Sequence, residues 1–277
     1  MEYMLYSLNK MTEEKPKIYL AGSFFDFRDK IITALPEHNF SDPRKHRQHS
    51  IASLVEDDMG EAKESPILLA CFPKGKSRGV MTYAEIGASF ISGNYIAIAD
   101  ENEKKDDSLE KIADYKTGSI DEAIEFMKYS WYNMLQHPAV KEENNKNNGN
   151  LNILLTTNQN YFTELKNIQE NGKKVFYVDD LESTEEIGKM DLTITMLPKG
   201  EEIDRRAVAF MGMAYALQIP NILIEENPVK YPPLLGLARR VFDNKDIAIS
   251  YLSQLKSQKI DDEAKIMYDL FKRYNVK

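Results

Sequence analysis

The chain is poor in cysteine and histidine and has no long apolar run, and each shortage excludes a class of protein. A single cysteine, Cys71, rules out a disulfide within the chain, and its apolar neighbours predict a buried core residue. The 4 histidines lack the spacing of metal ligands, so we expect no metal site. No apolar run approaches the ~18 residues that a membrane helix needs.

Basic residues are also in the minority. The net charge of −8 argues against nucleic acid as a main partner. A hydrophobic content of 42% and a charged content of 29% are typical of a soluble globular protein, and 277 residues can form two domains. Because residues 1–11 contain no apolar signal segment, we expect a cytoplasmic protein without a membrane partner.

The most informative stretch is 81–89, where one carboxylate, Glu85, stands among small and apolar residues. An apolar strand pattern at 67–72 precedes this stretch, and another at 95–99 follows it. Ligands of open α/β sheets bind outside the carboxyl ends of the strands, so a Glu on the helix after such a strand faces a binding crevice. The simpler interpretation is a structural Glu in a helix start, where a carboxylate is favoured electrostatically.

Two further segments favour the functional interpretation. Residues 17–23 predict a short strand that ends in a Gly-Ser turn, and a helix is expected to open at 26–29. Gly22 would allow a ligand to approach the backbone closely. Residues 53–59 predict a helix that carries several carboxylates toward the strand at 67.

In order and spacing, these elements resemble the nucleoside 2-deoxyribosyltransferase family, which includes the related deoxynucleoside-monophosphate N-glycosidases. The matching positions are Tyr19, Gly22-Ser23, Asp58 and Glu85-Ile86-Gly87-Ala88. The resemblance covers roughly residues 15–135. It implies that Glu85 is the nucleophile that captures C1′ of the deoxyribose and that Asp58 lies beside the sugar and the base. Arg28 also matches an arginine that follows the Gly-Ser loop in the N-glycosidase branch of this family.

The chain departs from this family at the loop before the glutamate. Gly79 and Met81 stand where the family usually has Asp or Ser and Gly, and the loop at 73–79 is basic. We expect Ser77 to supply the missing polar group, and Tyr19 and Tyr83 to orient Glu85. The predicted catalytic residues are Glu85, Asp58 and Tyr19. The predicted substrate-binding residues are Gly22, Ser23, Arg28, Asp57, Ser77 and Tyr83.

The order of predicted elements repeats on either side of a polar segment at 141–150. Alternating strands and helices on both sides predict an α/β protein of two Rossmann-like (flavodoxin-like) lobes, each with a parallel sheet flanked by helices. The catalytic domain is expected at 1–140 and a degenerate repeat at 151–277. Residues 83–89 align with 208–214, which places Phe210 at the position of Glu85. The repeat is interpreted as a scaffold, with the alternative that Asp204 completes a site across the interface.

The basic run at 44–49 predicts a solvated loop, or alternatively a positive lip that attracts phosphate. Three functions remain open. The first is transfer of deoxyribose between nucleobases in nucleotide salvage. The second is hydrolysis of deoxynucleoside monophosphates, with Arg28, Lys76 and Arg78 on the phosphate. The third is nucleotide sensing without catalysis. The expected partners are a nucleoside or nucleotide and a nucleobase, with no cofactor and with further homo-oligomerisation.

Overall fold

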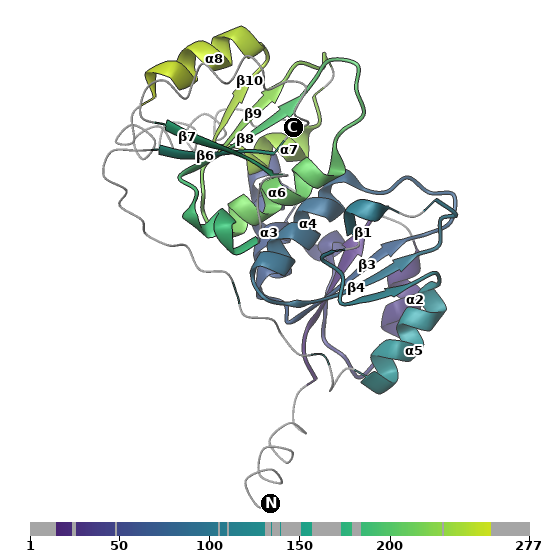
Figure 1. Cartoon of the computed structure of the whole chain (residues 1–277). Coiled ribbons are helices and arrows are strands. Elements are labelled where there is room, and N and C mark those ends of the chain that lie inside the picture. The colour runs from purple at the N-terminus through teal and green to yellow at the C-terminus, as the bar shows by residue number, and fades with distance from the viewer. Residues whose placement is uncertain are drawn as a thin grey trace, which may run out of the picture.

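Figure 1 shows the fold of the chain, a computed structural model. The structure describes residues 15–23, 26–47, 49–104, 106–109, 111–130, 134, 139, 151–156, 173–178, 184–228 and 230–255. The polar segment at 141–150, which its composition predicts to be a linker, lies outside these residues, as do two helices that the sequence pattern predicts near 161–170 and 261–274. In the described residues, no helix is long and apolar enough to cross a bilayer.

The first lobe contains a parallel sheet of 5 strands in the order β2-β1-β3-β4-β5. The strands are β1 (Ile18–Gly22), β2 (Phe40–Ser41), β3 (Ile67–Phe72), β4 (Tyr95–Asp100) and β5 (Tyr115–Thr117). The helices are α2 (Phe27–Ala34), η1 (Pro43–Lys45), α3 (Ile51–Glu64), α4 (Val80–Ile91), η2 (Asp107–Leu109) and α5 (Ile120–Ser130). The alternating residues of β1 and β3 divide between two cores: α2 and α5 cover one face of the sheet, while α3 and α4 cover the other (Figure 1).

The second lobe contains another parallel sheet of 5 strands, in the order β10-β9-β8-β6-β7. Its strands are β6 (Leu151–Leu155), β7 (Lys173–Tyr177), β8 (Leu192–Leu197), β9 (Asn221–Glu225) and β10 (Arg240–Phe242). Among the described residues, its helices are η7 (Thr184–Lys189), α6 (Arg205–Ala216), α7 (Pro232–Leu237) and α8 (Lys245–Gln254). Helix α8 packs on one face of the sheet, and α6 belongs to the core on the other face.

Counted from the first strand of each lobe, both sheets have the strand order 2-1-3-4-5, which is the flavodoxin-like order. The predicted α/β architecture of two lobes with parallel sheets is therefore confirmed. The offset in residue number between α4 and α6 is the same as that between β3 and β8. The same offset relates two equivalent hydrogen bonds. Gly75 N–H donates to Asn102 Oδ1 in the first lobe, and Gly200 N–H donates to Asn227 Oδ1 in the second.

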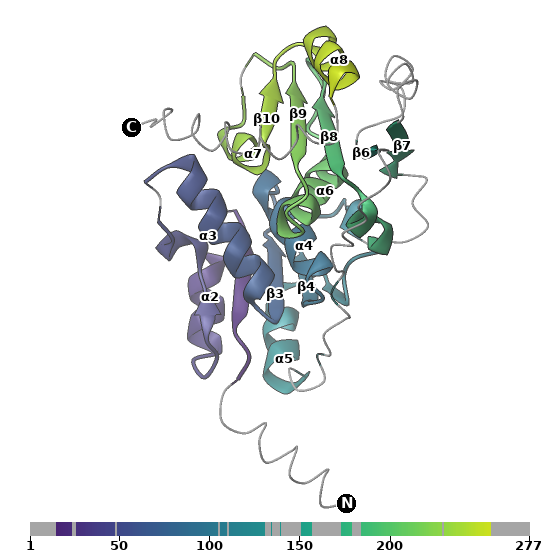
Figure 2. The same cartoon turned by 90° about the vertical axis from the view of Figure 1, so that its left-hand side faces the viewer.

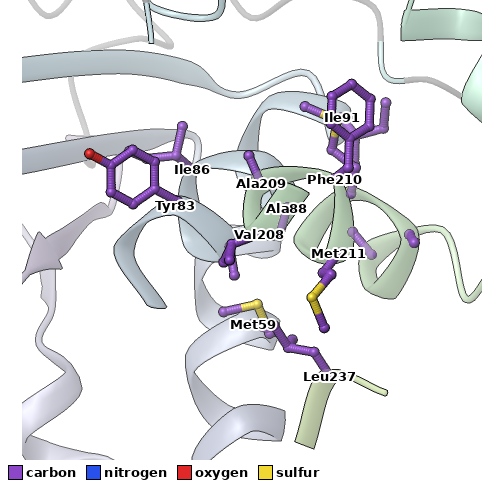
Figure 3. Packing of buried hydrophobic residues seen from close by; sticks show 14 of the residues in the cluster. Met59, Tyr83, Ile86, Ala88, Ile91, Val208, Ala209, Phe210, Met211 and Leu237 are labelled. Atoms are coloured by element: carbon purple, nitrogen blue, oxygen red, sulfur yellow. The ribbon is translucent and has the colours of Figure 1, made fainter. Parts of the chain in front are cut away.

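The lobes meet where α4 crosses α6, and the contact is reciprocal (Figure 3). A Cβ built on Gly87 would lie 2.0 Å from the carbonyl oxygen of Ala209, and one built on Gly212 would lie 2.0 Å from that of Ala84. The offset in residue number that relates the lobes converts Gly87 into Gly212 and Ala84 into Ala209, so the two contacts are equivalent, as expected for a pseudo-twofold axis between the helices. Glycine at both positions permits the helix backbones to touch.

Several elements of the sequence-based prediction needed correction. The short strands β2, β5 and β10 were missed, and so was α7. Strands of two or three residues at the sheet edge carry too little periodicity to be recognised, and α7 contains Pro232 and Pro233, which suggest a turn. In contrast, the apolar pattern predicts a strand at 151–155 and a helix at about 205–217, and the structure has β6 at Leu151–Leu155 and α6 at Arg205–Ala216.

Candidate active site

The candidate site lies on the face of the first sheet that α3 and α4 cover. Tyr19 comes from the middle of β1, Asp58 from α3 and Glu85 from α4. The three side chains interact electrostatically, since the charges of Glu85 and Asp58 both contribute to raising the pKa of Tyr19, after burial as the main cause. The structure therefore brings together the three residues that were predicted to be catalytic.

Glu85 is 5% exposed, and its Oε2 has no hydrogen-bond partner among the described residues. Burial, and then the charge of Asp58, raise the pKa of Glu85 to about 8, against the lowering effect of Arg28. The Tyr19 hydroxyl lies beside this carboxyl group, and their interaction shifts the pKa of both residues, but neither this hydroxyl nor Oε2 completes a hydrogen bond of ordinary geometry. Buried polar atoms are almost always paired, so these two atoms are candidates for ligand contact.

Asp58 is held by a histidine that the sequence analysis assigned to a solvated loop. His46 Nδ1 lies 2.7 Å from Asp58 Oδ1, and His46 Nε2 lies 3.3 Å from the hydroxyl of Ser41. The His46 side chain is only 11% exposed, so the prediction of a solvated loop is wrong for this residue. Recognition of β2 would have identified His46, because the loop after that strand begins at the carboxyl edge of the sheet.

Arg28 fixes the turn after β1. Its guanidinium donates to the carbonyl oxygens of Leu20, Gly22 and Ser23, and its Nε lies 3.6 Å from Asp42 Oδ1. The side chain is 1% exposed. Burial lowers the pKa of Arg28, and the Glu85 and Asp42 carboxylates oppose this effect. Arg28 therefore positions the backbone next to the site and adds a positive charge to it.

The turn itself requires glycine. Gly22 has a φ of 141°, and a Cβ there would lie 2.6 Å from the carbonyl oxygen of Cys71. The next residue, Ser23, donates its hydroxyl to the carbonyl oxygen of Ser77, which ties the turn to the loop before α4. The Ser23 hydroxyl also occupies space that a side chain at Gly79 would need, since a Cβ there would lie 3.1 Å from it.

The loop at 73–79 is attached to the segment that follows β4. Arg78 forms a 2.7 Å ion pair with Asp100 and donates to the carbonyl oxygen of Lys104. Ser77 is exposed, and its carbonyl oxygen, rather than its hydroxyl, makes the contact with Ser23. The proposed polar role of the Ser77 hydroxyl stays a prediction.

Two predicted residues have other partners. Asp57 accepts hydrogen bonds from the backbone and side chain of Arg47, which lower its pKa to about 2. Tyr83 donates its hydroxyl to Asp106 Oδ2 at 2.5 Å, so this proton does not orient Glu85. Figure 3 shows Tyr83 at the interface between the lobes, where Arg205 of α6 lies 3.2 Å from Asp106.

The second lobe lacks the counterparts of the two central side chains. The pairing of β1 with β3 and of β6 with β8 places Leu154 at the position of Tyr19. The common start of α4 and α6 places Phe210 at the position of Glu85. Asp204 accepts hydrogen bonds from the backbone N–H groups of Arg206 and Ala207, so its carboxylate caps α6.

The second lobe nevertheless brings one side chain close to the first-lobe site, and the sequence analysis missed it. The Glu85 carboxylate contributes to raising the pKa of Tyr231, after burial as the main cause. Tyr231 lies next to α7, a helix that was not predicted. No group of three or more metal-binding side chains occurs in the described residues.

No protein-family model and no curated protein matches the chain. Among solved structures, a 2-deoxyribosyltransferase from Bacillus psychrosaccharolyticus matches with a TM-score of 0.36 and 16% identity, over 44% of this chain and 98% of that one. A putative sugar-binding protein from Salmonella typhimurium LT2 gives 0.25 and 11%, over 91% and 90% of the two chains. A D-mandelate dehydrogenase from Rhodotorula graminis gives 0.24 and 10%, over 90% and 94%. These similarities are too low to indicate a substrate or a reaction.

Proposed function

We propose that the chain cleaves the N-glycosidic bond of a 2′-deoxynucleoside, with Glu85 as the nucleophile, and passes the deoxyribosyl group to a second nucleobase. The observation that carries this proposal is the buried Glu85 carboxyl group, whose Oε2 has no partner and which lies beside Asp58 and Tyr19. A buried carboxyl group of raised pKa next to a second carboxyl group is a common arrangement in sites that cleave glycosidic bonds.

Cleavage breaks the bond between C1′ and the base nitrogen, and the electron pair leaves with the base. Positive charge then builds on C1′ and the ring oxygen, where the Glu85 carboxylate stabilises it and forms an ester bond to C1′. Because the pKa of Glu85 is raised to about 8, the carboxyl group carries a proton at neutral pH. The developing positive charge favours the ionised form, so Glu85 releases this proton to the neighbouring Asp58 carboxylate as the glycosidic bond breaks.

The leaving base needs a proton on the nitrogen that receives the electron pair. Asp58 and His46, 2.7 Å apart, form the group that holds and delivers it. The hydrogen bond to His46 fixes the orientation of Asp58, and Ser41 lies on the other side of the ring. A positioned general acid of this kind contributes about 10²–10⁴-fold to a rate.

Two observations favour a nucleoside over a nucleoside monophosphate. The Arg28 guanidinium donates hydrogen bonds to three backbone carbonyl oxygens beside the site. Arg78 is paired with Asp100 and with the carbonyl oxygen of Lys104. Both guanidinium groups that would recognise a 5′-phosphate therefore already have protein partners.

The burial of Glu85 favours transfer over hydrolysis. With only 5% of the residue exposed, water has little access to the ester that would form on its carboxylate. Exclusion of water prolongs such an intermediate, which allows a second base to occupy the place of the first. A ring nitrogen of the second base then attacks C1′ and gives its proton to Asp58, and the ester bond breaks to release the Glu85 carboxylate.

The proposal is tested by incubating the protein with one deoxynucleoside, with and without a different free base, and separating the products by chromatography. A new nucleoside that forms only when the second base is present supports transfer. Release of free base alone supports the hydrolase alternative. Binding without turnover contradicts the proposed function and supports a sensor.

Glu85→Gln should abolish the reaction, because an amide neither forms the ester nor carries the charge. Glu64→Gln is the matched control, since Glu64 is exposed at the end of α3. Near-normal turnover by Glu85→Gln would contradict the assignment of the nucleophile.

A further inference from the structure

Helix α7 of the second lobe lies against α3 of the first lobe (Figure 2). A Cβ built on Gly236 would lie 2.7 Å from a methyl group of Val55 and 3.1 Å from one of Ile51. In Figure 3, Leu237 lies beside Met59, which directly follows Asp58 on α3. The second lobe therefore packs closely on the helix that carries Asp58.

Tyr231 occupies the residue before α7. Its side chain is half-buried and packs against the hydrophobic cluster between the lobes, which includes Tyr19 and Val55. Because Tyr231 directly precedes α7, the packing of α7 on α3 brings the phenol toward the site, and the charge of Glu85 contributes to raising the pKa of Tyr231, after burial.

The backbone around Tyr231 is held in place. Its N–H donates to Glu225 Oε1, and Glu225 is 1% exposed at the end of β9. The following Pro232 restricts the preceding residue to extended backbone, and Tyr231 has φ −96° and ψ 99°. The second lobe thus presents the Tyr231 side chain from a fixed position.

The pseudo-twofold axis relates Tyr231 to a residue that also crosses the interface. The offset in residue number that relates α4 to α6 pairs Tyr231 with Asp106. Asp106 of the first lobe reaches Arg205 at the start of α6 in the second lobe, at 3.2 Å. In both lobes, the segment after the fourth strand therefore extends to the neighbouring lobe.

We propose that Tyr231 closes the first-lobe site over Glu85 and thereby determines whether the glycosyl group passes to a second nucleobase or to water. This inference rests on the proposed function. In this proposal the phenol ring covers the carboxyl group from the side of the second lobe, opposite the Tyr19 and Asp58 side chains of β1 and α3. Removal of the ring admits water to the glycosyl ester, and hydrolysis then competes with transfer.

The test measures free base and new nucleoside formed from the same reaction, in the full chain and its variants. Tyr231→Ala should raise the ratio of hydrolysis to transfer by about tenfold, which corresponds to about 1.4 kcal/mol between the two barriers. Tyr231→Phe keeps the ring and should retain the wild-type ratio. Tyr129→Ala is the control, because Tyr129 is 67% exposed on α5. If Tyr231→Ala fails to fold, Tyr231→Leu serves in its place and should raise the ratio less.

An unchanged ratio in folded Tyr231→Ala, with transfer intact, would overturn this inference and leave the proposed function standing. Absence of both products from the wild-type protein would instead overturn the proposed function. A second measurement does not need activity: in protein with ¹³C-labelled tyrosine, the signal lost in Tyr231→Phe should shift in Glu85→Gln. A signal that does not respond would place Tyr231 away from Glu85 and overturn the inference.

Discussion

The two lobes share a strand order and an interface helix but differ at the positions where the chemistry is proposed. Tyr19 and Glu85 of the first lobe correspond to Leu154 and Phe210 of the second. The turns, the helix crossing and the glycines that permit it are matched between the lobes. The two lobes therefore share their packing and local hydrogen bonds, whereas the buried carboxyl group is present in the first lobe and replaced in the second.

The largest expected effect concerns two adjacent carboxylates on α3 of the first lobe, one in the proposed site and one outside it. Asp58→Asn should lower the turnover rate by about 10²–10⁴-fold, because the residue that holds the proton with His46 is lost. Asp57→Asn is the matched variant on the adjacent residue, whose carboxylate is bound by Arg47. It should change the rate by no more than about twofold. Steady-state kinetics of both variants decide the point, and similar losses would show that the two carboxylates share the task.

An intermediate effect concerns the crossing of α4 and α6, to which the two lobes contribute equivalent glycines. Gly87→Ala and Gly212→Ala should each destabilise the fold by about 3 kcal/mol, because each Cβ would meet a backbone carbonyl oxygen. Gly60→Ala on α3 is the control, since a Cβ there meets nothing within 4 Å, and it should be neutral or stabilising. Denaturant unfolding measures all three variants. A tolerated alanine at either Gly87 or Gly212 would show that the contact is not reciprocal.

The smallest effect, taken per pH unit, concerns the pH dependence of stability. The folded protein holds a proton on Glu85 up to a pKa of about 8, whereas the unfolded chain releases it near the ordinary value. Glu85 therefore lowers stability as the pH rises between these two values, by at most about 1.4 kcal/mol per pH unit. Phe210, its counterpart, has no such effect. Glu85→Gln should be increasingly more stable than wild type from about pH 5 to about pH 8. Parallel curves of melting temperature against pH would contradict the raised pKa.

Much of the fold could be predicted because long apolar strands and a repeated helix have clear sequence patterns. The alignment of 83–89 with 208–214 corresponds to the observed register of α4 and α6. Glu85, Asp58 and Tyr19 were recognised from short motifs on these regular elements. Short strands were not recognised, since β2 has only 2 residues.

The remaining parts of the site depend on contacts between residues distant in the sequence. His46 was assigned to solvent because the sequence gives no sign that the loop folds back on Asp58. Arg28 suggested a phosphate ligand, but the turn after β1 occupies its donors. The proposed role of Tyr231 depends on the packing of α7 on α3, which no local pattern encodes.

The most direct test of the central claim is to locate the covalent intermediate. The wild-type protein is incubated with a slow, 2′-fluoro-substituted deoxynucleoside analogue, quenched in acid, and analysed by intact mass and peptide mapping. We predict one glycosyl adduct per chain, on the peptide that contains Glu85, and none in the Glu85→Gln variant. An adduct on a peptide of the second lobe, or turnover of the analogue without any adduct at Glu85, would contradict the account.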